Sequence, residues 1–208
     1  MIYWLCSHSS IIREVAVLSD SNTTKRALAQ ALKDLLRAQP FEKVSVGALC
    51  GACGLNRKSF YYHFKDKYDL VEWIFNTEFV SAAEQPGAAE RWSFLQALCG
   101  YLYRERAFYA RIFQVEGQNA FRRYFSEYLF CATESFFRPG DSLTAAEQEN
   151  YRFFITFLRD AILAAVIRWL TEGSRLPPEE FVSRLHYISD TIDTQVWRKL
   201  SGEGTSCP

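Results

Sequence analysis

Apolar residues recur at helical spacing along almost the whole chain, and no stretch shows the apolar–polar alternation that is typical of a strand. The prolines fall between these stripes or at the start of one, where they end or begin a helix. The pattern therefore predicts an all-α fold. The expected helices span residues 23–39, 46–53, 57–63, 65–83, 92–104, 107–115, 119–137, 144–171 and 178–200.

Residues 44–70 have the layout of a helix-turn-helix unit. Ser45 and Asn56 are residue types that cap helix N-termini, and Gly54 between them tolerates the left-handed backbone of a sharp turn. In the second helix, Phe60 and another phenylalanine four residues on form a core-facing pair. The other positions are donors of the kind that reach phosphates and base edges: Arg57, Lys58, Ser59, Tyr61, Tyr62 and His63.

Positive charge gathers in the same part of the chain. Residues 22–70 hold nine Lys or Arg and four acidic residues, a balance of +5, so the rest of this neutral chain carries −5. A basic segment on a neutral chain fits a DNA-binding head joined to a body with another task. The 208 residues are enough for one small and one medium domain.

Several runs here resemble the DNA-binding domain of TetR-family transcriptional regulators, over about residues 23–79. The matching residues are the Ala-Cys-Gly-Leu-Asn turn at 52–56, the Phe-Tyr-Tyr-His-Phe run at 60–64, the Pro-Phe-Glu-Lys-Val run at 40–44, and Lys67 and Leu70. The resemblance implies a three-helix DNA-binding domain over 22–70. A linking helix would join it to a helical ligand-binding and dimerisation domain over 71–200. Residues 1–21 are then an extension, either a loose arm or an extra helix over residues 11–18, and residues 201–208 are expected to form a disordered tail.

The resemblance also places the second helix of the unit in the major groove of double-stranded DNA. Arg57 and Lys58 are candidates for contact with base edges, and each is equally a candidate phosphate clamp. Tyr61, His63 and Lys67 match positions that hold phosphate in the family, although His63 also suits a capping or core role. The expected DNA-binding residues are Ser45, Asn56, Arg57, Lys58, Ser59, Tyr61, Tyr62, His63 and Lys67.

Gly47 and Gly51 depart from the strong helix formers that are usual inside the first helix of the unit. Each glycine costs roughly 1 kcal/mol of helix stability relative to alanine. The two glycines are expected either to loosen this helix or to permit a closer approach to DNA.

The last two long amphipathic stretches lie over about 147–172 and 179–199. The expected apolar face of the first consists of Phe154, Leu158, Ala161, Ala165 and Trp169. TetR-family members dimerise by pairing their last two long helices with the same two of a partner, so the resemblance implies a homodimer on a palindromic operator. Two heads would also reach half-sites one helical turn apart, about 34–36 Å, whereas one head binds few phosphates. The alternative is that both stripes serve only the core of one chain.

Aromatic residues are concentrated in the second part of the chain, with nineteen Phe, Tyr or Trp from Trp92 to Trp169. They suit either a filled core or the cavity in which this family holds a small inducer, whose binding moves the two heads apart. The effector itself is not identified by the sequence. The candidate pocket residues are Tyr101, Tyr109, Arg111, Phe113, Tyr124, Tyr128, Phe154 and Arg159.

The expected function is therefore a sequence-specific transcriptional regulator, a homodimeric repressor released by a small-molecule effector. The alternative is an activator or co-regulator of the same fold that works through a protein partner without a ligand of its own. The run over 60–74 is similar to a branch of Gram-positive regulators that includes activators of dihydroxyacetone kinase operons. Some of that branch work with a ligand-binding partner.

No pattern in the sequence indicates an enzyme, a cofactor or a metal site. The three histidines lie far apart, and there is no nucleophile with a nearby base and no phosphate loop. Cys50 and Cys53 form a C-x-x-C on a buried stripe without a second ligand pair, so we expect packing, with thiol sensing as the alternative. Six cysteines without framework spacing suit a reducing cytoplasm, and no apolar run reaches the length of a membrane span.

Overall fold

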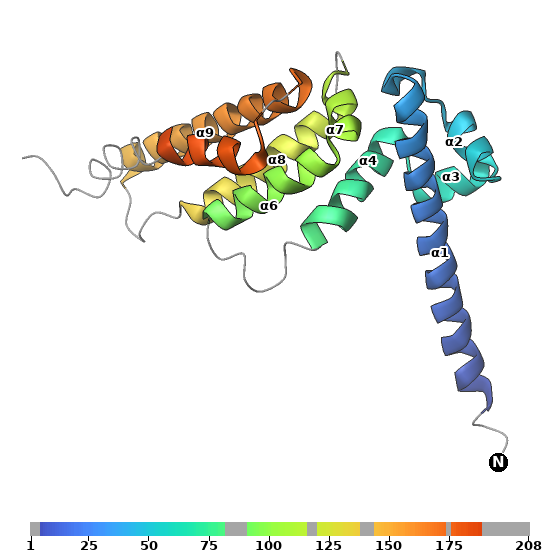
Figure 1. The fold of residues 1–208 in the computed structure, drawn as a ribbon. Coiled ribbons are helices and arrows are strands. Elements are labelled where there is room, and N and C mark those ends of the chain that lie inside the picture. Colours follow the sequence, from blue (N-terminus) through green and yellow to red (C-terminus); the bar gives the residue numbers. More distant parts are fainter. Residues whose placement is uncertain (1–4, 82–90, 116–119, 138–143, 174–175, 189–208) are drawn as a thin grey trace, which may run out of the picture. The chain divides into compact units, whose positions relative to one another are not determined.

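The structure of the chain, a computed structural model, describes residues 5–81, 91–115, 120–137, 144–173 and 176–188, with side chains from Ser21 onward. All regular structure in these residues is helical, which confirms the predicted all-α fold (Figure 1). The elements are α1 (Leu5–Ala38), η1 (Phe41–Lys43), α2 (Val46–Ala52), α3 (Arg57–His63), α4 (Lys67–Phe75), the π-helical η2 (Asn76–Val80), α6 (Arg91–Arg104), α7 (Arg106–Phe113), α8 (Ala120–Phe136) and α9 (Ala145–Thr171). Residues 178–188 are helical as well. The predicted tail at 201–208 and the predicted last helix beyond residue 188 lie outside the described residues.

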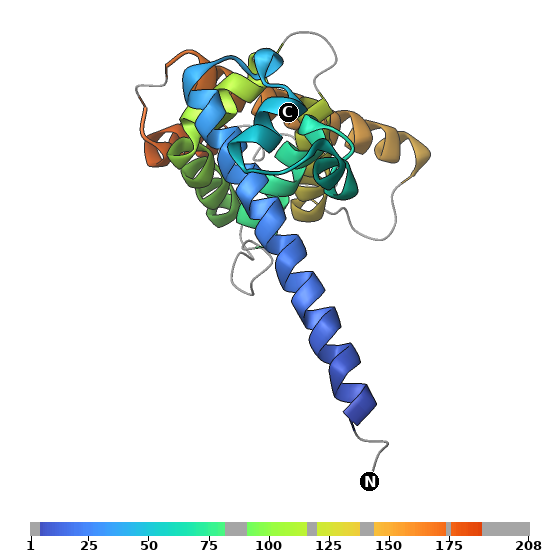
Figure 2. The ribbon, with the colours of Figure 1, turned by 90° about the vertical axis from the view of Figure 1, so that its right-hand side faces the viewer.

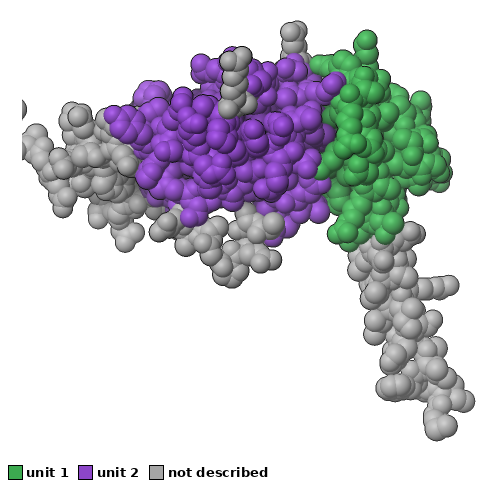
Figure 3. Space-filling model, viewed as in Figure 1, with its two compact units in different colours: residues 1–75 green, residues 76–208 purple. Residues whose placement is uncertain are grey.

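Two compact units divide the chain, and we call them the head (Met1–Phe75) and the body (Asn76–Pro208) (Figure 3). None of the described helices combines the length and the hydropathy that a membrane crossing requires.

The head is built on one face of the C-terminal half of α1, and Figures 1 and 2 both show α2 and α3 beside that half. Leu28, Leu32 and Leu36 recur every four residues along α1 and are fully buried or nearly so. Leu49 of α2 and Phe60 of α3 are fully buried too. This apolar core holds α3 in place while its outer side chains remain exposed.

The first helix begins much earlier than the sequence pattern predicts. We expected a start at residue 23 and, as one alternative, a separate helix over 11–18, but α1 runs without a break from Leu5. Neither proline nor glycine occurs between Leu5 and Ala38, so no residue in this stretch interrupts a helix. The start of the apolar stripe near residue 23 therefore does not mark the start of the helix.

The linking helix is shorter than predicted and changes its winding. The sequence pattern predicts one helix over 65–83, whereas α4 begins at Lys67 and is followed directly by the π-helical η2. Asp66 accounts for the start, because its carboxylate accepts the N–H groups of Tyr68 at 2.7 Å and of Asp69 at 2.9 Å.

The buried face of α9 also differs from the predicted one. The expected stripe was Phe154, Leu158, Ala161, Ala165 and Trp169, and of these only Trp169 is buried. The buried residues of α9 are Ile155, Leu163, Val166, Trp169 and Leu170. This helix is apolar around most of its circumference, so spacing alone does not select the face that packs.

The core of the body is a cluster of aromatic rings between α7 and α8, and α9 packs against both helices. Tyr109 is fully buried and stacks on Phe121, with ring centroids 5.6 Å apart. Phe113 lies 5.4 Å from Phe125 by the same measure. Ring pairs of this kind contribute stability in addition to that from the apolar area that the rings bury.

Candidate nucleic-acid interface

The unit formed by α2 and α3 is fixed by hydrogen bonds at both helix starts. The Ser45 hydroxyl accepts the N–H of Ala48 at 3.1 Å, and the Asn56 side chain accepts the N–H of Ser59 at 2.8 Å. Both predicted caps are therefore confirmed. The Ser59 hydroxyl also donates to the Asn56 side-chain oxygen at 3.2 Å.

The turn between the two helices depends on one glycine. Gly54 has a φ of +65°, a backbone conformation that residues with a Cβ seldom adopt, as predicted. The N–H of Leu55 then donates to the carbonyl of Cys50 at 2.8 Å and closes the end of α2. The direction in which α3 leaves the turn is thus set within a few residues.

The side chains of α3 divide into an anchor and an exposed face. Phe60 and Phe64 are buried, and their ring centroids are 5.7 Å apart, so the predicted core-facing pair is confirmed. Tyr61 is 58% exposed and Tyr62 is 78% exposed. Among the other predicted contacts, Ser45, Asn56, Arg57 and Lys58 are exposed, and Ser59 and His63 are half-buried. All but Lys67 thus lie on α3 or at the starts of α2 and α3.

Gly47 makes room for a side chain of α3 in this structure. A Cβ at Gly47 would lie 2.8 Å from Nη2 of Arg57, which is closer than such atoms approach. The guanidinium of Arg57 therefore rests on the first turn of α2. By contrast, a Cβ at Gly51 would meet no atom within 4 Å.

Lys67 joins the start of α4 to the segment between α1 and α2. Its ammonium donates to the carbonyls of Phe41 at 2.7 Å, Val44 at 3.0 Å and Glu42 at 3.3 Å, and lies 4.4 Å from the centroid of the Phe41 ring. Burial lowers the pKa of this ammonium, and the carboxylates of Glu42 and Asp66 oppose that effect. Because an ammonium has three N–H groups, these carbonyls occupy all of them. A phosphate contact by Lys67 remains a prediction, and it would compete with this arrangement.

The two cysteines of the C-x-x-C are packed within the head. Cys50 is buried, and the Cys53 thiol donates to the carbonyl of Ala27 at 3.3 Å. Burial raises the pKa of both thiols, which disfavours the reactive thiolate. Among the described residues, no three His, Cys, Asp or Glu side chains gather as a metal-ligand set.

Of the eight residues predicted to line a ligand cavity, three are buried in the core of the body and five are half-buried. The hydroxyls of Tyr101 and Tyr109 are 2.7 Å apart, and Tyr101 also donates to Glu78 at 3.0 Å. Burial raises the pKa of both tyrosines far above the ordinary range. Tyr124 donates to the side-chain oxygen of Asn76. The other predicted pocket residues are Arg111, Phe113, Tyr128, Phe154 and Arg159. None of the eight lines the pocket that the body does contain.

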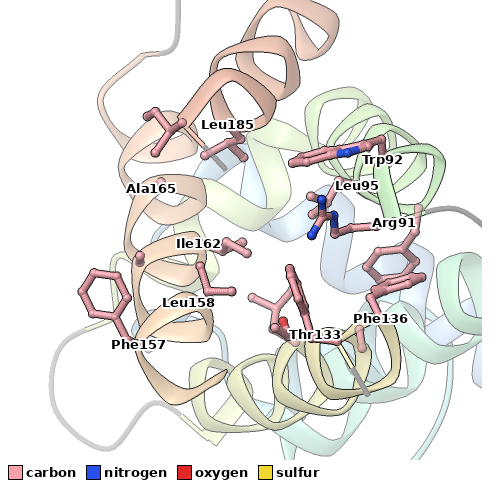
Figure 4. A pocket seen from close by; sticks show the side chains of 16 residues that line it. Arg91, Trp92, Leu95, Thr133, Phe136, Phe157, Leu158, Ile162, Ala165 and Leu185 are labelled. Carbon is pink, nitrogen blue, oxygen red and sulfur yellow. The ribbon is translucent and has the colours of Figure 1, made fainter. Parts of the chain in front are cut away.

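The body does contain a pocket of about 260 Å³, between α6, α8, α9 and residues 178–188 (Figure 4). Arg91, Trp92 and Thr133 are the wall residues with polar side-chain atoms, and the other described wall residues are apolar. Sequence patterns did not identify this pocket, because its walls come from four segments far apart in the chain. The one local signal was a basic residue beside a tryptophan at the start of α6.

Two family comparisons cover most of the chain. Residues 23–74 match the family described as "Bacterial regulatory proteins, tetR family", and residues 90–191 match the one described as "Transcriptional regulator C-terminal region". A similar curated protein is the HTH-type dhaKLM operon transcriptional activator DhaS of Lactococcus lactis subsp. lactis (strain IL1403), 27% identical over 100 residues. That alignment covers 48% of this chain and 54% of DhaS, so it spans about half the length of the relative.

Solved structures of such regulators have a similar fold. The dihydroxyacetone kinase operon activator DhaS superposes with a TM-score of 0.59 and 20% identity, over 83% of this chain and 95% of that one. NalD is the secondary repressor of the MexAB-OprM multidrug efflux pump in Pseudomonas aeruginosa. It superposes with a TM-score of 0.55 and 16% identity, over 80% of this chain and 93% of that one. At such identities these two likenesses show the fold alone. The two family matches go further, and the chain belongs to the TetR family of bacterial transcriptional regulators.

Proposed function

We propose that the chain works as a homodimeric, sequence-specific DNA-binding repressor that a small molecule releases from its operator. The observation that carries the DNA-binding part is the exposed face of α3, where Arg57, Lys58, Tyr61 and Tyr62 stand on a helix held by a cap and a buried anchor. Arginine and lysine suit guanine edges and phosphates, and tyrosine hydroxyls suit phosphates. A rigid helix that presents such donors fits the major groove.

Exposed apolar residues support the homodimer. Phe153 and Phe157 on α9 are 73% and 54% exposed, and Tyr187 and Ile188 near the end of the chain are 78% and 55% exposed. These residues lie on the two helical segments that we expect to pair with a partner copy. Large apolar side chains gathered on adjoining segments favour association over exposure to water.

The pocket in the body supports control by a ligand. A small molecule that binds better when the two heads are misplaced for the operator shifts the population toward that state. The operator is then released without any contact between the ligand and DNA. Such release requires only a difference in ligand affinity between the two states.

A second candidate function is activation through a protein partner. DhaS, the curated relative, is named as an activator, and this chain shares 27% identity with part of it. In that case the exposed apolar residues of the body would meet the partner protein, and the pocket would have no effect on DNA binding.

The test of the proposed function is selection of bound sequences from random duplex DNA with the purified chain at near-physiological salt. We expect a two-fold palindrome with half-sites about one helical turn apart, 34–36 Å. A single unpaired half-site would contradict the homodimer on DNA. No enrichment would favour the partner-dependent activator. The matched variant Phe153→Glu with Phe157→Glu should lose the palindrome but keep its folded helical content.

A further inference from the structure

The pocket of the body has an uneven distribution of polarity. Its walls on α9 and residues 178–188 are apolar and include Leu158, Ile162 and Leu185, whereas Arg91 on α6 brings a cation to the opposite side. Figure 4 shows the Arg91 side chain reaching into the space enclosed by these segments, with Trp92 beside it. Thr133 of α8 adds a hydroxyl and is 6% exposed.

Two aromatic rings fix the position of the Arg91 guanidinium. Its central carbon lies 4.6 Å from the centroid of the Trp92 ring and 4.6 Å from that of the Phe137 ring. Cation–π contacts of this kind engage the planar face of the guanidinium. The five N–H groups lie at its edge, where they match the two oxygens of a carboxylate. A pre-positioned guanidinium at an apolar cavity therefore recognises one negative charge at the end of an apolar molecule.

We propose that this pocket binds a small amphipathic carboxylate, a medium-chain fatty acid or an aryl-alkyl acid, with its carboxylate on Arg91. The apolar part of the ligand lies along Leu158, Ile162 and Leu185. A ligand cation is disfavoured, because the guanidinium of Arg91 would repel it. A polyanion such as a nucleotide has more charge than one arginine compensates.

The volume of the pocket limits the size of this ligand. About 260 Å³ equals the liquid volume of about nine water molecules at roughly 30 Å³ each. The ligand therefore has on the order of ten non-hydrogen atoms, as in octanoate or decanoate.

The position of the pocket connects the ligand to the proposed dimer face. Phe157 and Ile188 line the pocket, and they are also among the exposed apolar residues of the segments that we expect to pair. A ligand in the pocket thus contacts side chains that would reach the partner copy. This consequence for DNA release rests on the proposed function, whereas ligand binding itself does not.

The experiment is titration of the full chain with decanoate, decanol and decylamine, without DNA, followed by calorimetry and by tryptophan fluorescence. We expect decanoate to bind at least about tenfold more tightly than decanol, because a charge-assisted hydrogen bond is stronger than a neutral one. Decylamine should bind more weakly still. Equal affinity for decanoate and decanol, or no binding of decanoate, would overturn the proposal.

Variants separate the charge from the cavity. Arg91→Met should reduce decanoate affinity to that of decanol and leave decanol binding unchanged, whereas Ala165→Trp should abolish both by filling the pocket. Arg104→Met, on the exposed side of α6, is the matched control and should bind like the unaltered chain. An undiminished preference for decanoate in Arg91→Met would also reject the assignment. Operator affinity is measured separately, with and without decanoate. If decanoate binds and the operator binds but decanoate does not change operator affinity, only the coupling between the two has failed.

Discussion

In the head, most of the donors that we expect to touch DNA stand on one seven-residue helix, α3, with a local cap at its start and a buried phenylalanine beneath it. In the body, the pocket draws its walls from α6, α8, α9 and residues 178–188. The head therefore offers a rigid surface whose parts are close in sequence. The body offers a site that exists only when distant helices pack together.

This difference explains how the two regions can have separate tasks. A recognition surface must keep its shape, and the caps and the Gly54 turn fix it. A pocket between packed helices responds to an occupant, because small shifts of one helix change the others. Substitutions in each region should therefore have separable effects.

The largest expected effect is that of Phe60→Ala in the head. Removing a fully buried ring from beneath α3 should cost about 3–5 kcal/mol of unfolding free energy and abolish operator binding. Chemical denaturation followed by circular dichroism measures the loss, and decanoate binding reports on the body. The control Lys43→Ala changes an exposed side chain of the head and should stay within about 0.5 kcal/mol. Loss of ligand binding in Phe60→Ala would show that the two regions are not separable.

Lys67→Met should have the next largest effect, and it distinguishes two roles of one residue. If the ammonium chiefly holds the three carbonyls, unfolding free energy should fall by about 1–3 kcal/mol while the salt dependence of DNA binding is unchanged. If it chiefly binds phosphate, the slope of log affinity against log salt should fall by about one unit with little loss of stability. The control is Lys65→Met, which changes an exposed lysine two residues before Lys67. Our expectation is the first result, and a changed slope at full stability would refute it.

Asn56→Ala should have a smaller and more local effect. Loss of the cap on α3 should cost about 1 kcal/mol and weaken operator binding by fraying α3. Denaturant titration and operator binding at fixed salt measure the two effects. Asn56→Asp keeps an acceptor for the N–H of Ser59 and should restore stability. If Asn56→Asp is as unstable as Asn56→Ala, the cap is not the cause.

The smallest effect concerns the thiols, and it tests whether the aromatic body is closed around its core. Burial raises the pKa of the Cys99 thiol to about 12, so at pH 8 it stays protonated and shielded from solvent. Cys131 is exposed. Alkylation with iodoacetamide at pH 8, read by peptide mass spectrometry, should therefore modify Cys131 well before Cys99. Equal rates would mean that the core of the body opens readily.

Short-range chemistry in the sequence determined the local structure of the head. Ser45, Asn56 and Gly54 act on backbone groups within three or four residues of themselves, so their roles follow from residue type and spacing alone. The all-α fold likewise follows from apolar periodicity and from the positions of the prolines. The early start of α1 was missed, because the apolar stripe begins only near residue 23, whereas the helix continues back to Leu5 through residues that do not interrupt it.

Only the tertiary structure decided how the remaining residues are used. Spacing did not reveal which face of α9 packs, because this helix is apolar on most sides. The tyrosines at 101 and 109 were equally suited to a core or a cavity until packing joined their hydroxyls. The carbonyls that hold Lys67 lie more than twenty residues away in the chain, and the wall residues of the pocket range from Arg91 to Ile188. Contacts between distant segments depend on how whole helices pack, and a local pattern carries no information about that packing.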